Sequence, residues 1–507
     1  MTSRILRSAT ERALAAVLLL GTACGDLQVP VEYVKWDEET AAFGLGRGIV
    51  TTFRNRFGDD VESPYEPMID SLNGHHVVVA GGGSLLLNFC RQADPQTVSR
   101  EEFYRLGVIT EAKPVNLQLS RRLDGTWFGV EHDSISMLTA YVNFDNAAAF
   151  FRDVIHDDTL ATTTRARIAF YGEMALGCGN GRIGVALPVG AVDNAAFVGT
   201  ADMFIVLRDA VFASGIELGA NPGVAAHEYS HRIWQHNVFH GDEGFRLLAL
   251  SFLGSPSQQA ALCVDEVSAD GCACKASGTL LKAMDEGTAD IFAYTLTGRP
   301  AFFFDNSLAG STAVGDEDKV RDLSREPVID RAGSTISTEE VPFFNEKIVQ
   351  RAASTDTVCG QGEPALHYYR LGTLWSRGFY RSIVDPQSGN APADEAARVG
   401  WARAHYAPAV RVAESRVGDD FTTPVSGRDY TFRFEPRQLI RRYIEEVSVD
   451  RDTRVYLPAV HDAVCQEMCN RFGYLPFDQP VNGVPAQCSG FMGANEFSPL
   501  GVFPCQI

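Results

Sequence analysis

The chain has 507 residues, of which 45% are hydrophobic, so it can bury substantial cores in two or three domains. Its formal net charge is −20, whereas a basic surface is the usual electrostatic footprint of a nucleic-acid-binding protein. The composition therefore argues against nucleic acid as a partner and gives no sign of global disorder.

The N-terminus has the organisation of an export signal. Three arginines precede a short apolar run at 13–20, and small residues lead up to Cys24, an ending that resembles a bacterial lipobox. We therefore predict a lipoprotein-type signal peptide at 1–23 and a tether at 24–44 that begins with an acylated Cys24. Ordinary signal cleavage nearby is the alternative. Either route predicts a protein of the bacterial cell envelope, lipoprotein-anchored or secreted. On the lipoprotein route, the lipid on Cys24 is the only membrane contact that we predict.

The cysteine count agrees with export. The chain has eleven cysteines, and setting Cys24 aside for lipid leaves an even ten. Up to five disulfides follow, which requires an oxidising compartment. Cys465 and Cys469 are four residues apart and offer an alternative as a second metal pair, but no matching pair has the spacing of a structural zinc site. The turn-rich segment 451–507 carries four of the cysteines and is predicted to be a stapled C-terminal cap.

The region before the histidine motif predicts a lobe with a mixed sheet. Short apolar runs alternate with glycines from about 45 to 135 and favour strands, and a later segment favours a helix on which Phe150 and Phe151 pack inward. The expected elements lie at 76–80 (strand), 84–87 (strand), 141–156 (helix) and near 203–207 (edge strand). Together with the helix that follows, they predict an N-terminal lobe at 45–240.

The most informative stretch is a His-Glu-x-x-His motif formed by His227, Glu228 and His231. On a helix the two histidines share one face, where neutral imidazoles can take two corners of a tetrahedral zinc site. The glutamate between them can reach a water bound to that zinc. Asn221 can cap such a helix, and Pro222 suits its first turn.

A catalytic zinc site needs a third protein ligand, and two common spacings fail. Trp234 and Asn237 stand where a third histidine ligand would require glycine and histidine, and residues 247–252 contain no carboxylate. Glu286 is a better candidate, because Asp290 lies one turn later on the same helical face and can accept the outward N–H of a ligand histidine. Three other carboxylates remain alternatives: Asp242, Glu243 and Glu266. None of them has an acidic partner four residues on within an apolar helix.

With these motifs the chain resembles the gluzincin metallopeptidases, specifically the thermolysin and fungalysin families. The His-Glu-x-x-His motif and the Glu-x-x-x-Asp pair match two of their helices. Residues 366–375 resemble the family helix that bears a catalytic histidine, here His367. Residues 194–197 are similar to the Asn-Ala-aromatic strand on which substrate backbone pairs, which assigns substrate binding to Asn194 and Ala195. The four elements occur in family order.

The resemblance implies an α+β fold of the two-lobed, zincin-like type. The N-terminal lobe would carry the mixed sheet, a mainly helical C-terminal lobe would span 241–450, and the active-site helix would lie between them. Helices are expected in that second lobe at 280–296, 367–383 and 436–447.

The resemblance also implies a zinc-dependent endopeptidase that hydrolyses bonds within a protein or peptide substrate. Glu228 would act as general base and His367 would stabilise the oxyanion, while Asp290 would fix the tautomer of a ligand histidine. The implied zinc ligands are His227, His231 and Glu286.

Three further possibilities stay open. A catalytically silent surface-binding protein on the zincin scaffold is motivated by the long insertion between His231 and Glu286. An aminopeptidase is the second, although no Gly-x-Met-Glu-Asn-like segment is present to bind a free amine. The third concerns the acidic run at 316–318. Such a run is usually a solvated loop, and the alternative is that it contributes to a Ca²⁺ site.

Overall fold

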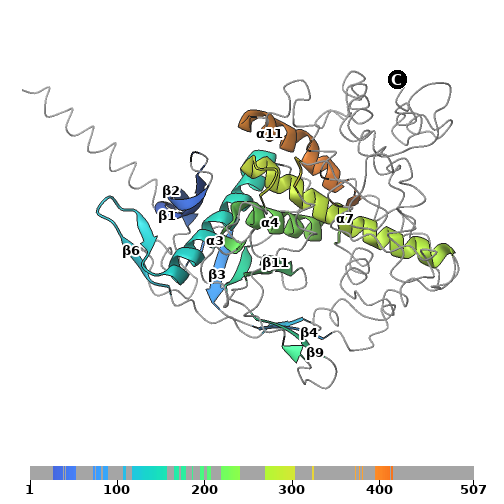
Figure 1. Ribbon diagram of the computed structural model, residues 1–507, viewed down its shortest axis with the longest axis horizontal. Helices are drawn as coiled ribbons and strands as arrows, with labels where there is room; N and C mark the ends of the chain where they lie inside the picture. Colours follow the sequence, from blue (N-terminus) through green and yellow to red (C-terminus); the bar gives the residue numbers. More distant parts are fainter. Residues whose placement is uncertain are drawn as a thin grey trace, which may run out of the picture.

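The fold is described from a computed structural model, drawn as a ribbon in Figure 1. The residues that the structure describes are 27–37, 39, 42–52, 72–74, 76–81, 84–88, 107–109, 117–156, 165–170, 173–177, 185–186, 195–198, 203–206, 218–239, 269–302, 322–324, 372, 376, 380, 394–411 and 413–414. Over these residues the protein is a mixed α and β structure, as the sequence predicts.

In the described part of the chain, the sheet nearest the histidine motif has four strands and is mixed. In spatial order they are β11 (Ala195–Val198), β12 (Met203–Val206), β8 (Ala166–Phe170) and β3 (Val77–Gly81). β11 runs antiparallel to β12, whereas β8 runs parallel to both β12 and β3. Among the described strands β11 is therefore at the edge, which corrects the expectation of an edge strand near 203–207. Those residues lie inside the sheet because β8 pairs with their other side.

Two more four-stranded sheets are present among the residues that the structure describes. The first has the order β2 (Ala42–Thr52), β1 (Leu27–Asp37), β7 (Trp127–Gly129) and β6 (Leu119–Arg121). The second has the order β10 (Val185–Ala186), β9 (Glu173–Gly177), β4 (Ser84–Asn88) and β5 (Gly107–Ile109). The strands predicted at 76–80 and 84–87 are thus both present.

The segment expected to be a tether is largely β structure. β1 pairs with β2 along its whole length, and its Val29 and Val31 side chains are buried. Val29, Val31 and Tyr33 are spaced two apart, which puts them on one face of a strand. The structure therefore differs from the expected tether at 24–44, because this alternation lets the segment join a sheet.

Helix α3 (His132–Ala149) begins earlier than the predicted start at 141. It continues as a π-helical turn at Phe150–Ile155, where the side chains of Phe150 and Phe151 are buried as expected. α3 packs against β1, β7 and β3 and against the histidine helix α4 (Pro222–Asn237).

One aromatic stack joins the sheet to both helices. Phe204 of β12 lies 4.3 Å from Phe144 of α3 and 6.1 Å from Tyr229 of α4, measured between ring centroids. All three side chains are buried. A helix turns by about 100° per residue, so His227 and His231, each two positions from Tyr229, point roughly away from this core. The sheet thereby orients both histidines toward a facing helix.

The facing helix is α7 (Ala269–Thr297), which packs along α4 (Figure 1). It contains the helix predicted at 280–296 and begins earlier. Where a helix is predicted at 367–383, the described residues Gly372, Ser376 and Tyr380 are helical. Farther on, α11 (Glu395–Trp401) leads into a π-helical turn at Ala402–Tyr406.

Several predicted features lie outside the described residues. They are the signal segment, the acidic run at 316–318, the helix at 436–447, the cap at 451–507 and the cysteine side chains. Of the helices that the structure describes, none combines the length and the apolar character needed to cross a membrane.

Candidate metal centre

The histidine helix begins as the sequence predicts. Asn221 is the N-cap, and its side-chain oxygen accepts the N–H of Gly223 at 2.9 Å, while Pro222 occupies the first turn. The side-chain amide of Asn221 also donates to the carbonyl of Phe302 at 2.6 Å. The cap therefore ties the start of α4 to the segment that follows α7.

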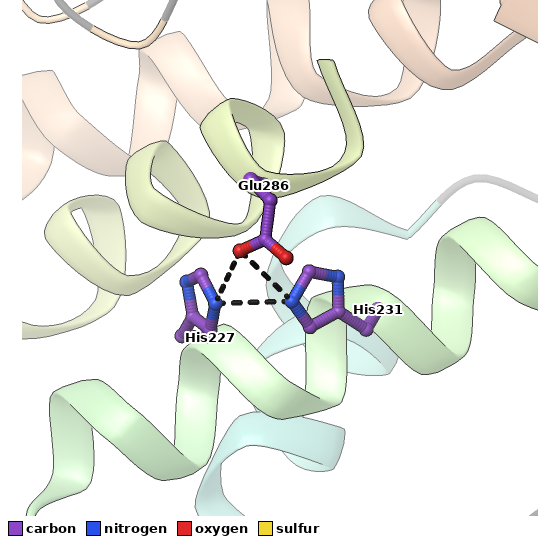
Figure 2. A group of neighbouring side chains, drawn as sticks. All are labelled: His227, His231 and Glu286. Carbon is purple, nitrogen blue, oxygen red and sulfur yellow. Dashed lines mark hydrogen bonds and ion pairs between the residues drawn. The ribbon is translucent and has the colours of Figure 1, made fainter. Parts of the chain in front are cut away.

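His227, His231 and Glu286 converge on one point between α4 and α7 (Figure 2). The two Nε2 atoms lie 3.0 Å apart, and Oε2 of Glu286 lies 3.3 Å from Nε2 of His227 and 3.5 Å from Nε2 of His231. All three side chains are buried. Two imidazoles and one carboxylate at these separations could hold a metal ion.

A carboxylate lies behind each histidine. Oδ1 of Asp290 is 2.9 Å from Nδ1 of His227, and Oδ1 of Asp285 is 2.7 Å from Nδ1 of His231. A carboxylate at Nδ1 favours the tautomer with its proton there, so that the lone pair on Nε2 can bind a metal. The sequence predicts the Asp290 contact, whereas the role of Asp285 was missed. The second ligand histidine also needs an acceptor, but this need does not say which carboxylate supplies it.

Lys282 completes the charged cluster on α7. Its Nζ lies 2.8 Å from Oδ2 of Asp285 and 3.0 Å from Oε1 of Glu286. Burial raises the pKa of Glu286, but the Lys282 ammonium and the two histidines outweigh burial and hold that pKa well below its usual range.

The pKa of His231 shifts in the opposite direction. Burial lowers its pKa, but the charges of Asp285 and Glu286 outweigh this and raise it to about 10. Without a metal, His231 therefore keeps a proton at neutral pH beside ionised carboxylates. A metal ion that binds here must displace this proton.

Glu228 connects α4 with the edge strand. Its side chain is buried, and Oε2 accepts the backbone N–H of Phe197 at 2.6 Å. Phe197 belongs to β11, so the outer edge of that strand lies beside the carboxylate of Glu228. Ala195 is buried in the same strand and is paired with Val206 of β12.

Other predicted site residues are not described. They are Asn194, His367 and the alternative carboxylates Asp242, Glu243 and Glu266. Gly372, from the same predicted helix as His367, packs against α7 at the candidate ligand. A Cβ at this position would lie 2.6 Å from the carbonyl oxygen of Ala283 and 3.1 Å from Cβ of Glu286. The close approach therefore requires glycine.

No protein-family model matches the chain, and no curated protein matches it significantly by sequence. Function is therefore inferred from the side chains of the site.

Proposed function

We propose that the protein is a zinc-dependent endopeptidase in which His227, His231 and Glu286 hold the metal. The spacing of the three donor atoms is the observation that carries this proposal. With metal–ligand bonds of about 2.0–2.1 Å, a tetrahedral site separates neighbouring donors by roughly 3.3–3.4 Å. The separations here are 3.0, 3.3 and 3.5 Å. Three protein ligands leave a fourth position open, as catalytic zinc requires.

The charge of the cluster also supports a bound cation. The carboxylates of Asp285, Glu286 and Asp290 are all buried, with exposed fractions of 4%, 3% and 1%. Buried carboxylates are costly unless opposite charge lies beside them. Lys282 and a protonated His231 supply part of that charge in the metal-free protein, and a dication would supply it when His231 is neutral.

The chemistry then follows from the neighbours of the metal. Zinc bound here would polarise the scissile carbonyl and lower the pKa of a water ligand to about 7. Glu228 takes the proton of the attacking water and delivers it to the leaving amine. An extended substrate pairs with the outer edge of β11, which lies beside Glu228, and so presents its backbone to that carboxylate. We assign stabilisation of the oxyanion to His367.

The proposal is tested by digestion of an unstructured protein, read by mass spectrometry. The wild-type protein should make internal cuts that disappear with a chelator and return with zinc. Glu228→Gln should retain zinc but lose about 100- to 10,000-fold in the rate of cleavage, because general-base catalysis is typically of that size. Glu395→Gln, which removes an exposed carboxylate of α11, serves as the matched control and should cleave normally.

The other outcomes are equally informative. Undiminished cleavage by Glu228→Gln would reject the mechanism. Trimming from one end only would indicate an aminopeptidase. Zinc binding without any cleavage would indicate a binding protein on the same scaffold.

We further propose that the chain adopts the two-lobed zincin arrangement and works in the bacterial cell envelope, anchored through a lipid on Cys24. Cys24→Ser should leave the protein unprocessed or release it from the membrane. Intact-mass measurement of the membrane fraction decides this: a mature chain that starts elsewhere, or that carries no lipid mass, rejects the anchor and leaves the zinc chemistry untouched.

A further inference from the structure

A lysine on the third-ligand helix contacts two residues of the metal centre. Lys282 precedes Asp285 by three residues and Glu286 by four on α7, and its Nζ reaches a carboxylate oxygen of each, at 2.8 and 3.0 Å. The lysine side chain is 28% exposed, whereas both carboxylates are buried. Its ammonium therefore reaches inward from the surface to the ligand cluster.

The two oxygens of Glu286 have different neighbours. Oε2 faces the Nε2 atoms of His227 and His231, at 3.3 and 3.5 Å, while Oε1 faces Lys282. A carboxylate whose oxygens are both free can bind a metal through either one or both. We propose that Lys282 positions Glu286 as a one-oxygen ligand and thereby keeps a metal coordination position open for substrate.

The same ammonium also acts on a second candidate ligand, His231, through Asp285. Asp285 contacts Lys282 through Oδ2 and His231 through Oδ1, at 2.8 and 2.7 Å. An ammonium group has three N–H donors, so it can serve both carboxylates at once. Lys282 thus orients Glu286 directly and His231 through Asp285, which are two of the three candidate ligands.

An ordinary helix ion pair would have different consequences. Such a pair changes stability but leaves the geometry of a bound metal unaltered. A positioning residue changes the coordination of the metal even in a variant that is fully folded. The inference rests on the metal centre of the proposed function, but it does not depend on peptide hydrolysis.

The test replaces Lys282 with methionine, which has an unbranched side chain without charge, and with arginine, which keeps the charge. Metal-depleted protein is loaded with Co²⁺, whose visible absorption is more intense in four-coordinate than in five-coordinate sites. The wild-type protein and Lys282→Arg should show the intense four-coordinate band. Lys282→Met should bind Co²⁺ with a weaker, shifted band, because Glu286 then binds through both oxygens.

Cleavage provides a second readout. With zinc bound, Lys282→Met should lose about tenfold or more in kcat/KM, as is typical when a partner of a metal ligand is removed. Arg47→Met is the control, since it removes a cation paired with a carboxylate on the surface of the β2 sheet. It should alter neither the spectrum nor cleavage. If Lys282→Met does not fold, judged by circular dichroism, Lys282→Gln replaces it, because its shorter neutral side chain cannot hold both carboxylates.

A folded Lys282→Met or Lys282→Gln protein with the wild-type Co²⁺ spectrum would overturn the positioning role. Wild-type protein that takes up no Co²⁺ would overturn both this inference and the zinc site. Protein that binds Co²⁺ but cleaves nothing would refute the peptidase alone, and the spectra would still decide the role of Lys282.

Discussion

Replacing Asp290 with alanine should weaken zinc binding without unfolding the protein. Its carboxylate lies 2.9 Å from Nδ1 of His227, and both side chains are buried. A hydrogen bond to a charged group contributes about 1.5–3 kcal/mol. Since about 1.4 kcal/mol corresponds to a factor of ten in affinity, the dissociation constant for zinc should rise by roughly 10- to 150-fold.

A second variant of Asp290 separates orientation from charge, and a surface variant serves as the control. Asp290→Asn keeps an oxygen that can accept the N–H of His227 but loses the negative charge, so its effect should be smaller than that of alanine. Asp124→Ala removes a carboxylate that pairs with Arg47 at 2.9 Å on the surface. Exposed pairs contribute little, so this control should bind zinc as the wild-type protein does.

The assay is competition for zinc between metal-depleted protein and a chromophoric chelator, at fixed pH. Urea unfolding of the metal-free variants reports any loss of stability that is independent of the metal. If folded Asp290→Ala binds zinc within twofold of the wild-type protein, the carboxylate does not orient His227 for metal binding.

Three other perturbations have expected outcomes. Gly372→Ala should place its Cβ against the backbone of α7 and beside Glu286, which costs about 1–3 kcal/mol in urea unfolding and weakens zinc binding; an unchanged dissociation constant would contradict this. The pKa of His231 is raised to about 10 in the metal-free protein, so the stability from its protonation is full below pH ~6.5 and is lost as the pH rises through ~10. Zinc affinity should therefore rise about tenfold per pH unit from pH 7 to 9, with about one proton released in calorimetry; a flat profile would show that His231 is already neutral. Asn221→Ala removes the cap of α4 and leaves the carbonyl of Phe302 without this donor, so the free energy of unfolding should fall by about 1–2 kcal/mol. A variant at an exposed surface position should not show this fall.

The candidate metal centre could be predicted from sequence because its parts are local. The spacing of His227 and His231 fixes their shared face once a helix is present, and Asn221 marks where that helix begins. Glu286 lies far along the chain, but Asp290 one turn later distinguishes it from other carboxylates.

Asp285 could not be found in the same way. It directly precedes Glu286, so on a helix it points about 100° away and does not share the face of Glu286 and Asp290. Its contact with His231 exists because α7 packs along α4. The pairing of these helices is tertiary information, which neither local spacing nor periodicity contains.

The start of α3 was missed for a related reason. Its first turns carry Ser134 and Thr139, which are buried although they are polar. Ser134 accepts the backbone N–H of Gln118, and Thr139 accepts that of Val34, which joins the helix to the neighbouring strand segments. Polar residues that face the core in this way interrupt the apolar periodicity from which a helix is predicted.

The five residues of the histidine motif show how the fold determines the site. His227 and His231 face α7, Glu228 bonds to β11, Tyr229 packs on β12, and Ser230 hydrogen-bonds at 2.7 Å to a tyrosine of the π-helical turn after α11. Successive residues point about 100° apart, so five adjacent side chains reach four different neighbours. Rotation of α4 about its axis would break all of these contacts together. The packing against strands and helices therefore holds the two histidines in place. The orientation of α4 that directs them toward Glu286 also brings Glu228 to the strand edge where substrate is proposed to bind.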